Sequence, residues 1–330
     1  MDYLKLPKIE LHLHLDCSLS YEVVKKLDPK ITPEVYAEEF QASPKCTDLV
    51  DYIKRALKGA DLMQTKEALH LVTLDLFDQL KAENVIYAEI RFAPLQHLQE
   101  GLTPFEVVET VNLAVEEGIA QTGVEVGIIL CTLRHFSRAQ SMETVKLVET
   151  FQGTHVVGFD IASDEAGFPI TNHIDAFAYA RERGFSVTAH AGEAKGAESV
   201  WETLLHFYPS RIGHGVRSVE DPKLMVFLKE EDIHLEVCPT SNLHTHVVDK
   251  IEDHPADRIY NSGVSMSINT DGRTVSNVSL TEEYQKLEKV FAWEKAHFMK
   301  CNLEAIRHAF ISEEKKADLR KRLLAGFGQV

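Results

Sequence analysis

The sequence has few of the features that mark secreted or membrane-spanning proteins. Its 330 residues contain only five cysteines, and no two of them form a CxxC pair. An odd number of scattered cysteines is typical of a reducing compartment rather than of a disulfide framework. No apolar run approaches the length that crosses a bilayer, and the first residues lack the charged-then-apolar pattern of a secretory signal. We therefore expect a soluble, cytoplasmic protein.

An excess of positive charge is also missing. The chain has 35 Lys and Arg residues against 51 Asp and Glu residues, which gives a formal net charge of −16. Nucleic acids and anionic membranes are bound mainly through Lys and Arg side chains. This balance argues against a nucleic acid or a membrane as a partner.

Linkers, repeats and low-complexity segments are absent as well, so the sequence offers no place for a domain boundary. A length of 330 residues is long for one domain, but α/β barrels often reach it. We predict a single domain that spans residues 1–330.

Apolar runs typical of buried strands alternate with amphipathic helical stretches along the whole chain. Strict alternation of strands and helices predicts a closed (β/α)₈ barrel, the TIM-barrel fold of the α/β class. An open doubly wound sheet is the alternative, but the glycine-rich turn that usually follows its first strand is missing. The eight predicted strands are residues 9–15, 85–93, 124–133, 156–162, 185–193, 211–216, 233–239 and 264–271.

The interval between the first two predicted strands is long. It contains helical stretches around residues 33–41, 48–60 and 65–83, which predict a helical insertion over the mouth of the barrel. Further along, Thr103–Glu106 reads Thr-Pro-Phe-Glu, a capping box with proline at the first helical position.

The first strand carries polar residues at alternate positions. In Ile9-Glu10-Leu11-His12-Leu13-His14-Leu15-Asp16, alternation places His12, His14 and Asp16 on one face and the leucines on the other. A lone His-x-His pair is a weak signal, because most histidines bind nothing. Whether this pair binds a metal therefore depends on polar residues elsewhere in the chain.

Three later strands also end in polar residues: His190 and Glu193 close the fifth, His214 the sixth and Asp271 the eighth. In a barrel, the carboxyl ends of all strands meet at one mouth. Three histidines with one carboxylate suit a divalent metal, most often zinc. His214 and Glu193 remain as candidates for proton transfer near a metal-activated water.

Five motifs follow one another in this order: PKIELHLHLDCSL (7–19), AHAGE (189–193), RIGHGV (211–216), CPTSN (238–242) and SINTD (267–271). Together they resemble the adenosine deaminase family of the amidohydrolase superfamily. The resemblance implies an enzyme of purine metabolism that deaminates adenosine and 2′-deoxyadenosine hydrolytically, with inosine or 2′-deoxyinosine and ammonia as products.

The resemblance also implies roles for single residues. Glu193 would face N1 of the purine, His214 would contact the attacking water, and Asp271 would help to orient and deprotonate that water. Asp16 would face the ribose 5′-hydroxyl, and the backbone around Ser163 would face purine N3. One zinc ion per chain would be held by His12, His14, His190 and Asp271.

Two departures from the family pattern concern the substrate. The family often has a second aspartate after the last metal ligand, where it contacts purine N7, but this chain has Gly272 followed by Arg273. The family commonly has glycine where this chain has Cys17. Because Gly272 has no side chain, N7 would need another donor, such as Arg273, Asn277 or an ordered water. Arg273 could instead pair with an anionic group on a larger substrate.

Other functions remain open from the sequence. The enzyme could deaminate another aminopurine, such as adenine, AMP or aminodeoxyfutalosine, although a carboxylate at Asp16 would repel a phosphate. A metal-dependent amide or ester hydrolase is a second alternative, but no lysine ends the third to fifth strands to bridge two metals. An inactive binding protein is the third, against which the complete set of polar strand ends argues.

Overall fold

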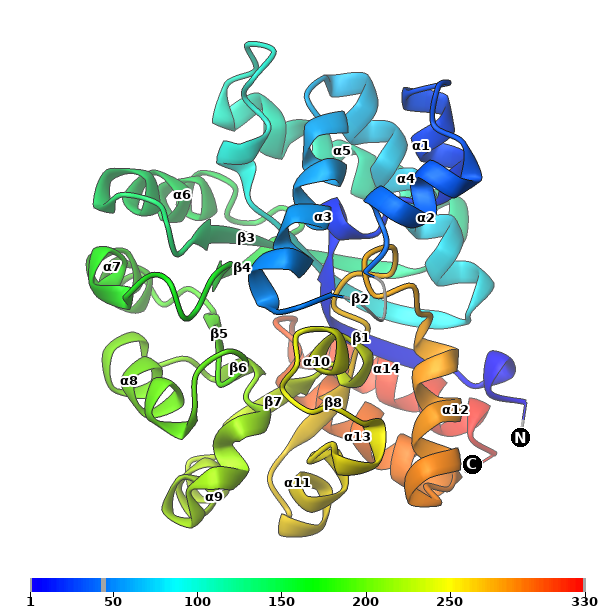
Figure 1. Ribbon diagram of the computed structural model, residues 1–330, viewed down its shortest axis with the longest axis vertical. Coiled ribbons are helices and arrows are strands. Elements are labelled where there is room, and N and C mark those ends of the chain that lie inside the picture. The colour runs from blue at the N-terminus through cyan, green and yellow to red at the C-terminus, as the bar shows by residue number, and fades with distance from the viewer. Residues whose placement is uncertain (1, 43–45, 329–330) are drawn as a thin grey trace.

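The computed structural model describes residues 2–42 and 46–328, with parallel strands at its centre and helices around them (Figure 1). Within these ranges, the strands form two parallel four-stranded sheets. The first sheet contains β1 (Lys8–His14), β2 (Val85–Phe92), β3 (Glu125–Leu133) and β4 (Val156–Ala162). The second contains β5 (Thr188–Ala191), β6 (Arg211–His214), β7 (His234–Val237) and β8 (Met266–Ile268).

Two parallel bridges join the sheets into a barrel. Leu13 of β1 pairs with Asp271, which follows β8, and Phe159 of β4 pairs with Val187, which precedes β5. At the second junction, the backbone N–H of Phe159 donates to the carbonyl of Ser186 at 3.0 Å. The predicted (β/α)₈ barrel is therefore confirmed.

The strands of the second sheet are shorter than predicted. Glu193 and Asp271 follow β5 and β8 in the turns at the barrel mouth rather than lying within the strands. The reason is local, because Gly192 and Asp271 have φ angles of 68° and 67°, which end an extended strand.

The helical insertion between β1 and β2 is also confirmed. It comprises α1 (Tyr21–Leu27), α2 (Pro33–Glu39), α3 (Leu49–Leu62) and α4 (Lys66–Ala82). Helix α3 packs against η2 (Leu15–Cys17), the short 3₁₀ turn that directly follows β1. The insertion thereby covers the carboxyl end of the first strand.

The remaining helices connect the strands or follow β8. The predicted capping box begins α5, where Thr103 accepts from the N–H of Glu106 and the Glu106 side chain accepts from the N–H of Thr103. Among the described residues, no helix combines the length and the apolar character needed to cross a membrane. The helices that connect the strands from β2 onward or follow β8 are α5 (Pro104–Thr122), α6 (Arg138–Thr150), α7 (Ile174–Glu182), α8 (Ala197–Phe207), α9 (Pro222–Glu230), α10 (Pro239–His244), α11 (Ala256–Ser262), α12 (Leu280–Phe291), α13 (Lys295–His308) and α14 (Glu313–Gly326).

The inner and outer faces of the strands differ in chemistry. Leu11 and Leu13 are fully buried in the main hydrophobic cluster, which also contains residues of the surrounding helices. Lys8, Glu10 and His12 alternate with them and are also fully buried, so β1 presents charged and polar groups on its other face. A buried polar group needs partners, and those partners define the site.

Candidate active site

A cavity of about 320 Å³ opens at the carboxyl ends of the strands. Its size falls within the roughly 300–1,000 Å³ of typical small-molecule sites. Helix α3 contributes an apolar wall that includes Leu49, Val50, Ile53 and Leu57. The polar lining residues include His14, Asp16, His190, Glu193, His214 and Asp271.

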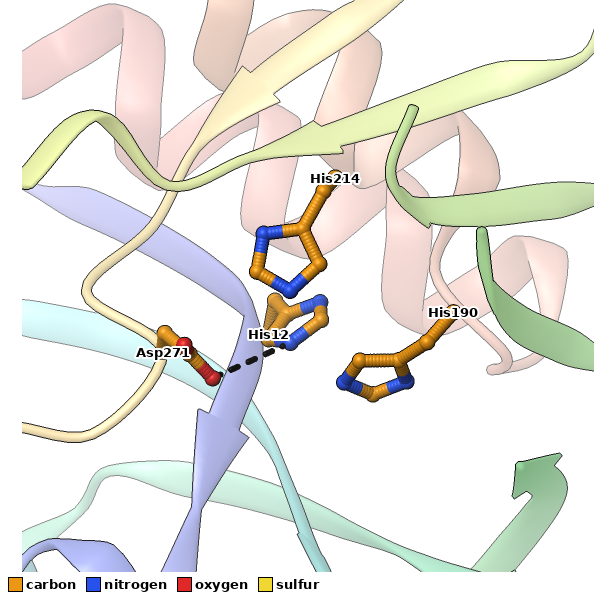
Figure 2. Close-up of side chains that lie close together, drawn as sticks. All are labelled: His12, His190, His214 and Asp271. Atoms are coloured by element: carbon orange, nitrogen blue, oxygen red, sulfur yellow. Dashed lines mark ion pairs between the residues drawn. The ribbon is translucent and has the colours of Figure 1, made fainter. Parts of the chain in front are cut away.

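A cluster of imidazoles and one carboxylate lies at the floor of this cavity. His12, His190, His214 and Asp271 each bring one nitrogen or oxygen within 4.8 Å of the others (Figure 2). His14 adds a fifth group, since its Nε2 lies 3.1 Å from His190 Nε2 and 3.4 Å from Asp271 Oδ1. Side chains from β1, β5, β6 and the turn after β8 therefore converge on one point.

Hydrogen bonds from outside the cluster hold the rings of His12 and His190 through their Nδ1 atoms, so their Nε2 atoms lie on the side of the cluster. His12 Nδ1 lies 2.8 Å from Glu236 and His190 Nδ1 lies 3.0 Å from Asp160, so both rings donate outward from Nδ1. Among the described residues, the buried His12 Nε2 has no hydrogen-bond partner, and it lies 3.3 Å from Asp271 Oδ1. Imidazole nitrogens oriented by carboxylates, together with a carboxylate oxygen, fit one divalent metal ion.

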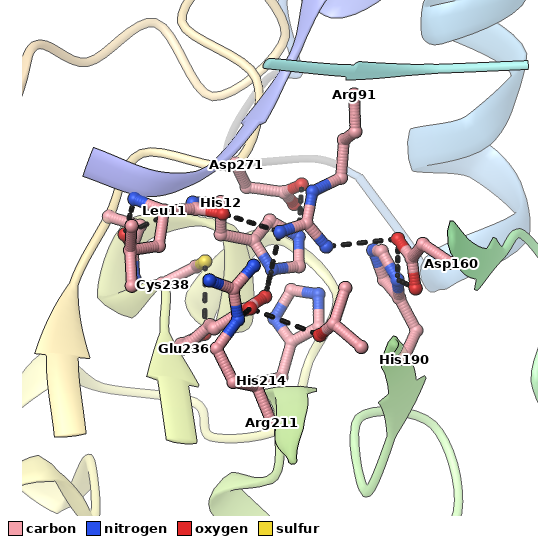
Figure 3. A network of polar contacts seen from close by, with 12 residues as sticks. Leu11, His12, Arg91, Asp160, His190, Arg211, His214, Glu236, Cys238 and Asp271 are labelled. Atoms are coloured by element: carbon pink, nitrogen blue, oxygen red, sulfur yellow. Dashed lines mark hydrogen bonds and ion pairs between the residues drawn. The ribbon is translucent and has the colours of Figure 1, made fainter. Parts of the chain in front are cut away.

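Buried arginines support the two orienting carboxylates (Figure 3). Arg91 contacts Asp160 at 2.9 Å and Glu236 at 2.8 Å, and Arg211 contacts Glu236 at 2.7 Å. Burial alone would raise the pKa of Glu236, but Arg91 and Arg211 hold that pKa well below its ordinary value. Glu236 therefore stays ionised and keeps accepting from His12. No local sequence pattern predicts this network.

The tautomer of His214 follows from a chain of three hydrogen bonds. The N–H of Ala256 donates to His254 Nδ1, so His254 carries its proton on Nε2, 3.2 Å from Asn242 Oδ1. Asn242 then donates from Nδ2 to His214 Nδ1 at 3.1 Å. The proton of the neutral His214 ring thus lies on Nε2, and a protonated nitrogen donates a hydrogen bond rather than binding a metal.

Glu193 is buried beside His214, with its Oε2 3.6 Å from His214 Nε2. Burial raises the pKa of Glu193 well above its ordinary value, and the nearby carboxylates of Asp271 and Glu165 raise it further. Both effects favour the protonated form of the Glu193 carboxyl. Burial also lowers the pKa of His214 well below its usual range, so its ring is neutral.

Three residues of the site have left-handed backbone conformations that are uncommon outside glycine. The φ angles are 83° at Ser163, 60° at His214 and 67° at Asp271. Such conformations cost on the order of 1–3 kcal/mol each and persist where the surroundings enforce them. At Asp271, the hydroxyl of Ser241 donates to Oδ2 at 2.6 Å, which fixes the carboxylate.

Asp16 and Ser163, which are predicted to contact the substrate, both line the cavity. Burial raises the pKa of Asp16 to about 6, and the thiol of Cys17 donates to Asp16 Oδ1 at 3.5 Å.

Gly272 lies where the backbone approaches η2 closely. A β-carbon at this position would stand 2.6 Å from Cys17 Cβ and 3.3 Å from the hydroxyl of Tyr52. No side chain fits there while Cys17 is present. Gly272 is not among the described residues that line the cavity.

The structure corrects the expectation for Arg273. Its guanidinium is 2.7 Å from Glu10 and 2.6 Å from Glu83, its side chain is buried, and it is not among the described lining residues. Two carboxylates of the barrel wall, one on β1 and one just after α4, already pair with the charge that we expected to meet substrate.

Arg273→Ala should therefore lower stability more than it changes substrate choice. Removing one partner of a buried ion pair costs about 3–5 kcal/mol, because the remaining charge loses its partner. Urea unfolding should show this loss, while the ratio of kcat/KM between adenosine and AMP stays within about twofold of wild type.

Arg307→Ala is the matched control, since Arg307 pairs with Asp232 at the surface. Its cost should stay below about 1 kcal/mol. A stable Arg273→Ala protein with an altered preference for anionic substrates would restore Arg273 as a substrate contact.

A parallel barrel with this cluster at its carboxyl mouth defines an enzyme of the amidohydrolase type. The adenosine deaminase family model matches residues 7–325. An adenosine deaminase from Clostridium acetobutylicum is 35% identical over 97% of this chain and 98% of its own length. The chain belongs to the adenosine deaminase family, and it is an aminohydrolase.

Solved structures agree with this assignment. The crystal structure of an adenine deaminase from Arthrobacter aurescens superposes with a TM-score of 0.89 at 26% identity, over 97% of this chain and 98% of that one. Arabidopsis ADAL complexed with IMP superposes with a TM-score of 0.88 at 25% identity, over 100% and 99% of the two chains. These two relatives differ in the purine compound associated with them, since one is an adenine deaminase and the other is complexed with IMP.

Proposed function

We propose that this protein is a zinc-dependent enzyme that deaminates adenosine and 2′-deoxyadenosine to inosine and 2′-deoxyinosine. The observation that carries the proposal is the position of Glu193, a buried carboxyl with a raised pKa at the edge of the His and Asp cluster. Hydrolytic deamination needs both a nucleophile and an acid next to one ring carbon, and this cavity floor offers both.

In this proposal, His12, His14, His190 and Asp271 hold one zinc ion. A bound zinc supplies the nucleophile, because it lowers the pKa of water toward about 7. His14 is assigned as the third imidazole ligand in preference to His214, whose Nε2 carries a proton in the hydrogen-bond chain from Ala256. His214 then donates from Nε2 and orients the attacking water.

Glu193 protonates N1 of the purine as water attacks C6. A carboxyl group kept neutral by burial can donate this proton, which lets the aromatic ring accept the electron pair of the nucleophile. Asp271 takes the proton of the attacking water and passes it to the amino nitrogen. The tetrahedral C6 then expels ammonia as the C6–O double bond forms, and the proton of the C6 hydroxyl returns to the Glu193 carboxylate.

The substrate end of the cavity favours a nucleoside over a nucleotide. Asp16 lines the cavity, and in the proposed pose it accepts from the ribose 5′-hydroxyl. A 5′-phosphate would bring a second negative charge close to the carboxylate of Asp16. Two like charges about 4 Å apart repel by about 4 kcal/mol at an effective dielectric constant near 20.

A spectrophotometric screen of aminopurines with purified protein tests this choice. We expect adenosine and 2′-deoxyadenosine to be turned over well, and kcat/KM for AMP to be at least about 100-fold lower because of that repulsion. Adenine and aminodeoxyfutalosine should also be poor substrates.

Asp16→Asn supplies the internal control, because it removes the charge and keeps the shape. The ratio of kcat/KM for adenosine to kcat/KM for AMP should be smaller in this variant than in wild type. If wild type prefers AMP or adenine, the nucleoside assignment is wrong and the deaminase chemistry stands.

A further inference from the structure

The carboxylate of Glu165 accepts hydrogen bonds from one whole turn of the cavity wall. Glu165 lies in the connection between β4 and α7 and is 3% exposed. It accepts from the hydroxyl of Ser199 at 2.5 Å. It also accepts from four consecutive backbone N–H groups, those of Gly192 at 2.7 Å, Glu193 at 3.0 Å, Ala194 at 2.6 Å and Lys195 at 2.9 Å.

This turn has few other ways to satisfy its backbone. It follows β5 directly and precedes α8, so its N–H groups belong to neither element. A buried N–H without a partner costs about 1–3 kcal/mol, and a bond to a charged acceptor is stronger than one to a neutral acceptor. Glu165 therefore fixes the path of residues 192–195.

The Glu193 side chain depends on that path. Among the described residues, Glu193 Oε1 has no hydrogen-bond partner, and the 3.6 Å between Oε2 and His214 Nε2 exceeds a hydrogen bond. The backbone path of residues 192–195 therefore sets where the Glu193 side chain enters the cavity.

We propose that Glu165 is a positioning residue that holds Glu193 in place for proton transfer by binding the backbone of residues 192–195. The inference rests on the proposed role of Glu193 as the proton donor. It assigns a function to a buried carboxylate that contacts neither the metal ligands nor the substrate.

Glu165→Gln is the informative substitution, because the amide keeps the volume and loses both the charge and one acceptor atom. The new NH₂ group would face backbone N–H donors, so the turn must move. A displacement of about 1 Å at a reacting group can cost about 10²-fold in rate. We expect kcat to fall by about that factor, while KM changes far less because most of the cavity lining is untouched.

A double-mutant cycle with Glu193→Gln separates positioning from general destabilisation. If Glu165 acts through Glu193, then Glu165→Gln should lower kcat by about 10²-fold in wild type and by less than about twofold in the Glu193→Gln background. The rate of backbone hydrogen exchange at residues 192–195 should rise in Glu165→Gln, while the midpoint of global unfolding should stay close to that of wild type.

Glu83→Gln is the matched control. Glu83 is also a buried carboxylate that accepts from helix N–H groups, at 3.2 Å from Leu280 and 3.0 Å from Thr281. Its effect on kcat should be the same factor in both backgrounds. Should Glu165→Gln fail to fold, Ser199→Ala removes one of the five bonds and should show the same dependence on background at smaller size.

Each outcome has a distinct meaning. An equal loss of kcat in both backgrounds, or a Glu165→Gln enzyme with wild-type kcat, would overturn the positioning role. A Glu193→Gln enzyme with wild-type kcat would instead refute the proposed proton donor, and with it the function on which this inference rests.

Discussion

Glu193→Gln should keep its metal and lose most of its turnover. The amide occupies the same volume in the buried pocket but cannot deliver a proton to purine N1. General acid catalysis contributes about 10²–10⁴-fold, so kcat should fall by at least that range. Burial raises the pKa of Glu193, which favours the protonated carboxyl that this substitution removes.

The measurement combines steady-state kinetics with metal analysis of the same preparation. Glu198→Gln is the control, since Glu198 is an exposed glutamate close by in the chain whose carboxylate accepts from the N–H of Gly196. It should leave both kcat and metal content close to wild type. Turnover near wild type in Glu193→Gln would exclude this residue as the acid.

Loss of the metal should abolish activity altogether. Protein purified without added zinc should contain about one equivalent of a divalent metal, as expected of a site with one set of ligands. His12→Ala and Asp271→Ala should each reduce that content to a small fraction and bring turnover to background. Both side chains are buried at the cluster, where each would supply one ligand atom to the proposed metal site.

The thermal midpoint offers a readout independent of activity. A metal that binds only the folded chain stabilises it, so a chelator should lower the midpoint of wild type and barely change that of His12→Ala. His234→Ala removes another buried barrel imidazole, one that contacts Ser265 and Ser267, and should retain about one equivalent of metal. Two equivalents in wild type would refute the mononuclear site.

The same analysis decides between His14 and His214. His14→Ala should lose the metal, whereas His214→Ala should keep it and turn over slowly. The hydrogen-bond chain through Asn242 is the reason, because it leaves His214 Nε2 protonated. The reverse pattern would make His214 the ligand.

The barrel could be predicted because its buried strands are short apolar runs, separated by segments whose apolar residues recur at helical spacing. The strands of the first sheet end close to the predicted limits, and His12 and His14 stand out because period-two alternation exposes a polar face within leucines. These signals are local, so the sequence alone carries them.

Contacts between distant segments were not predictable in the same way. Arg91 and Glu236 interrupt apolar strands with the same alternation as His12, yet nothing local says that they meet. Glu165 lies two residues after Ser163, but its hydrogen-bond partners are 27 or more residues away along the chain. Arg273 was misplaced because its proximity to Asp271 in sequence does not determine the direction of its side chain.

The close approach of Gly272 to Cys17 ties the two departures from the family pattern into one. A β-carbon at residue 272 would lie only 2.6 Å from the β-carbon of Cys17, so the two atoms would clash. The order of evolutionary change is thereby constrained. Consider a lineage that changes from glycine at 17 and a larger residue at 272 to the reverse arrangement. It must pass through an intermediate with glycine at both positions, since an intermediate with larger residues at both is sterically blocked. Laboratory evolution that samples one position at a time would find the route from this chain only if residue 17 changes first.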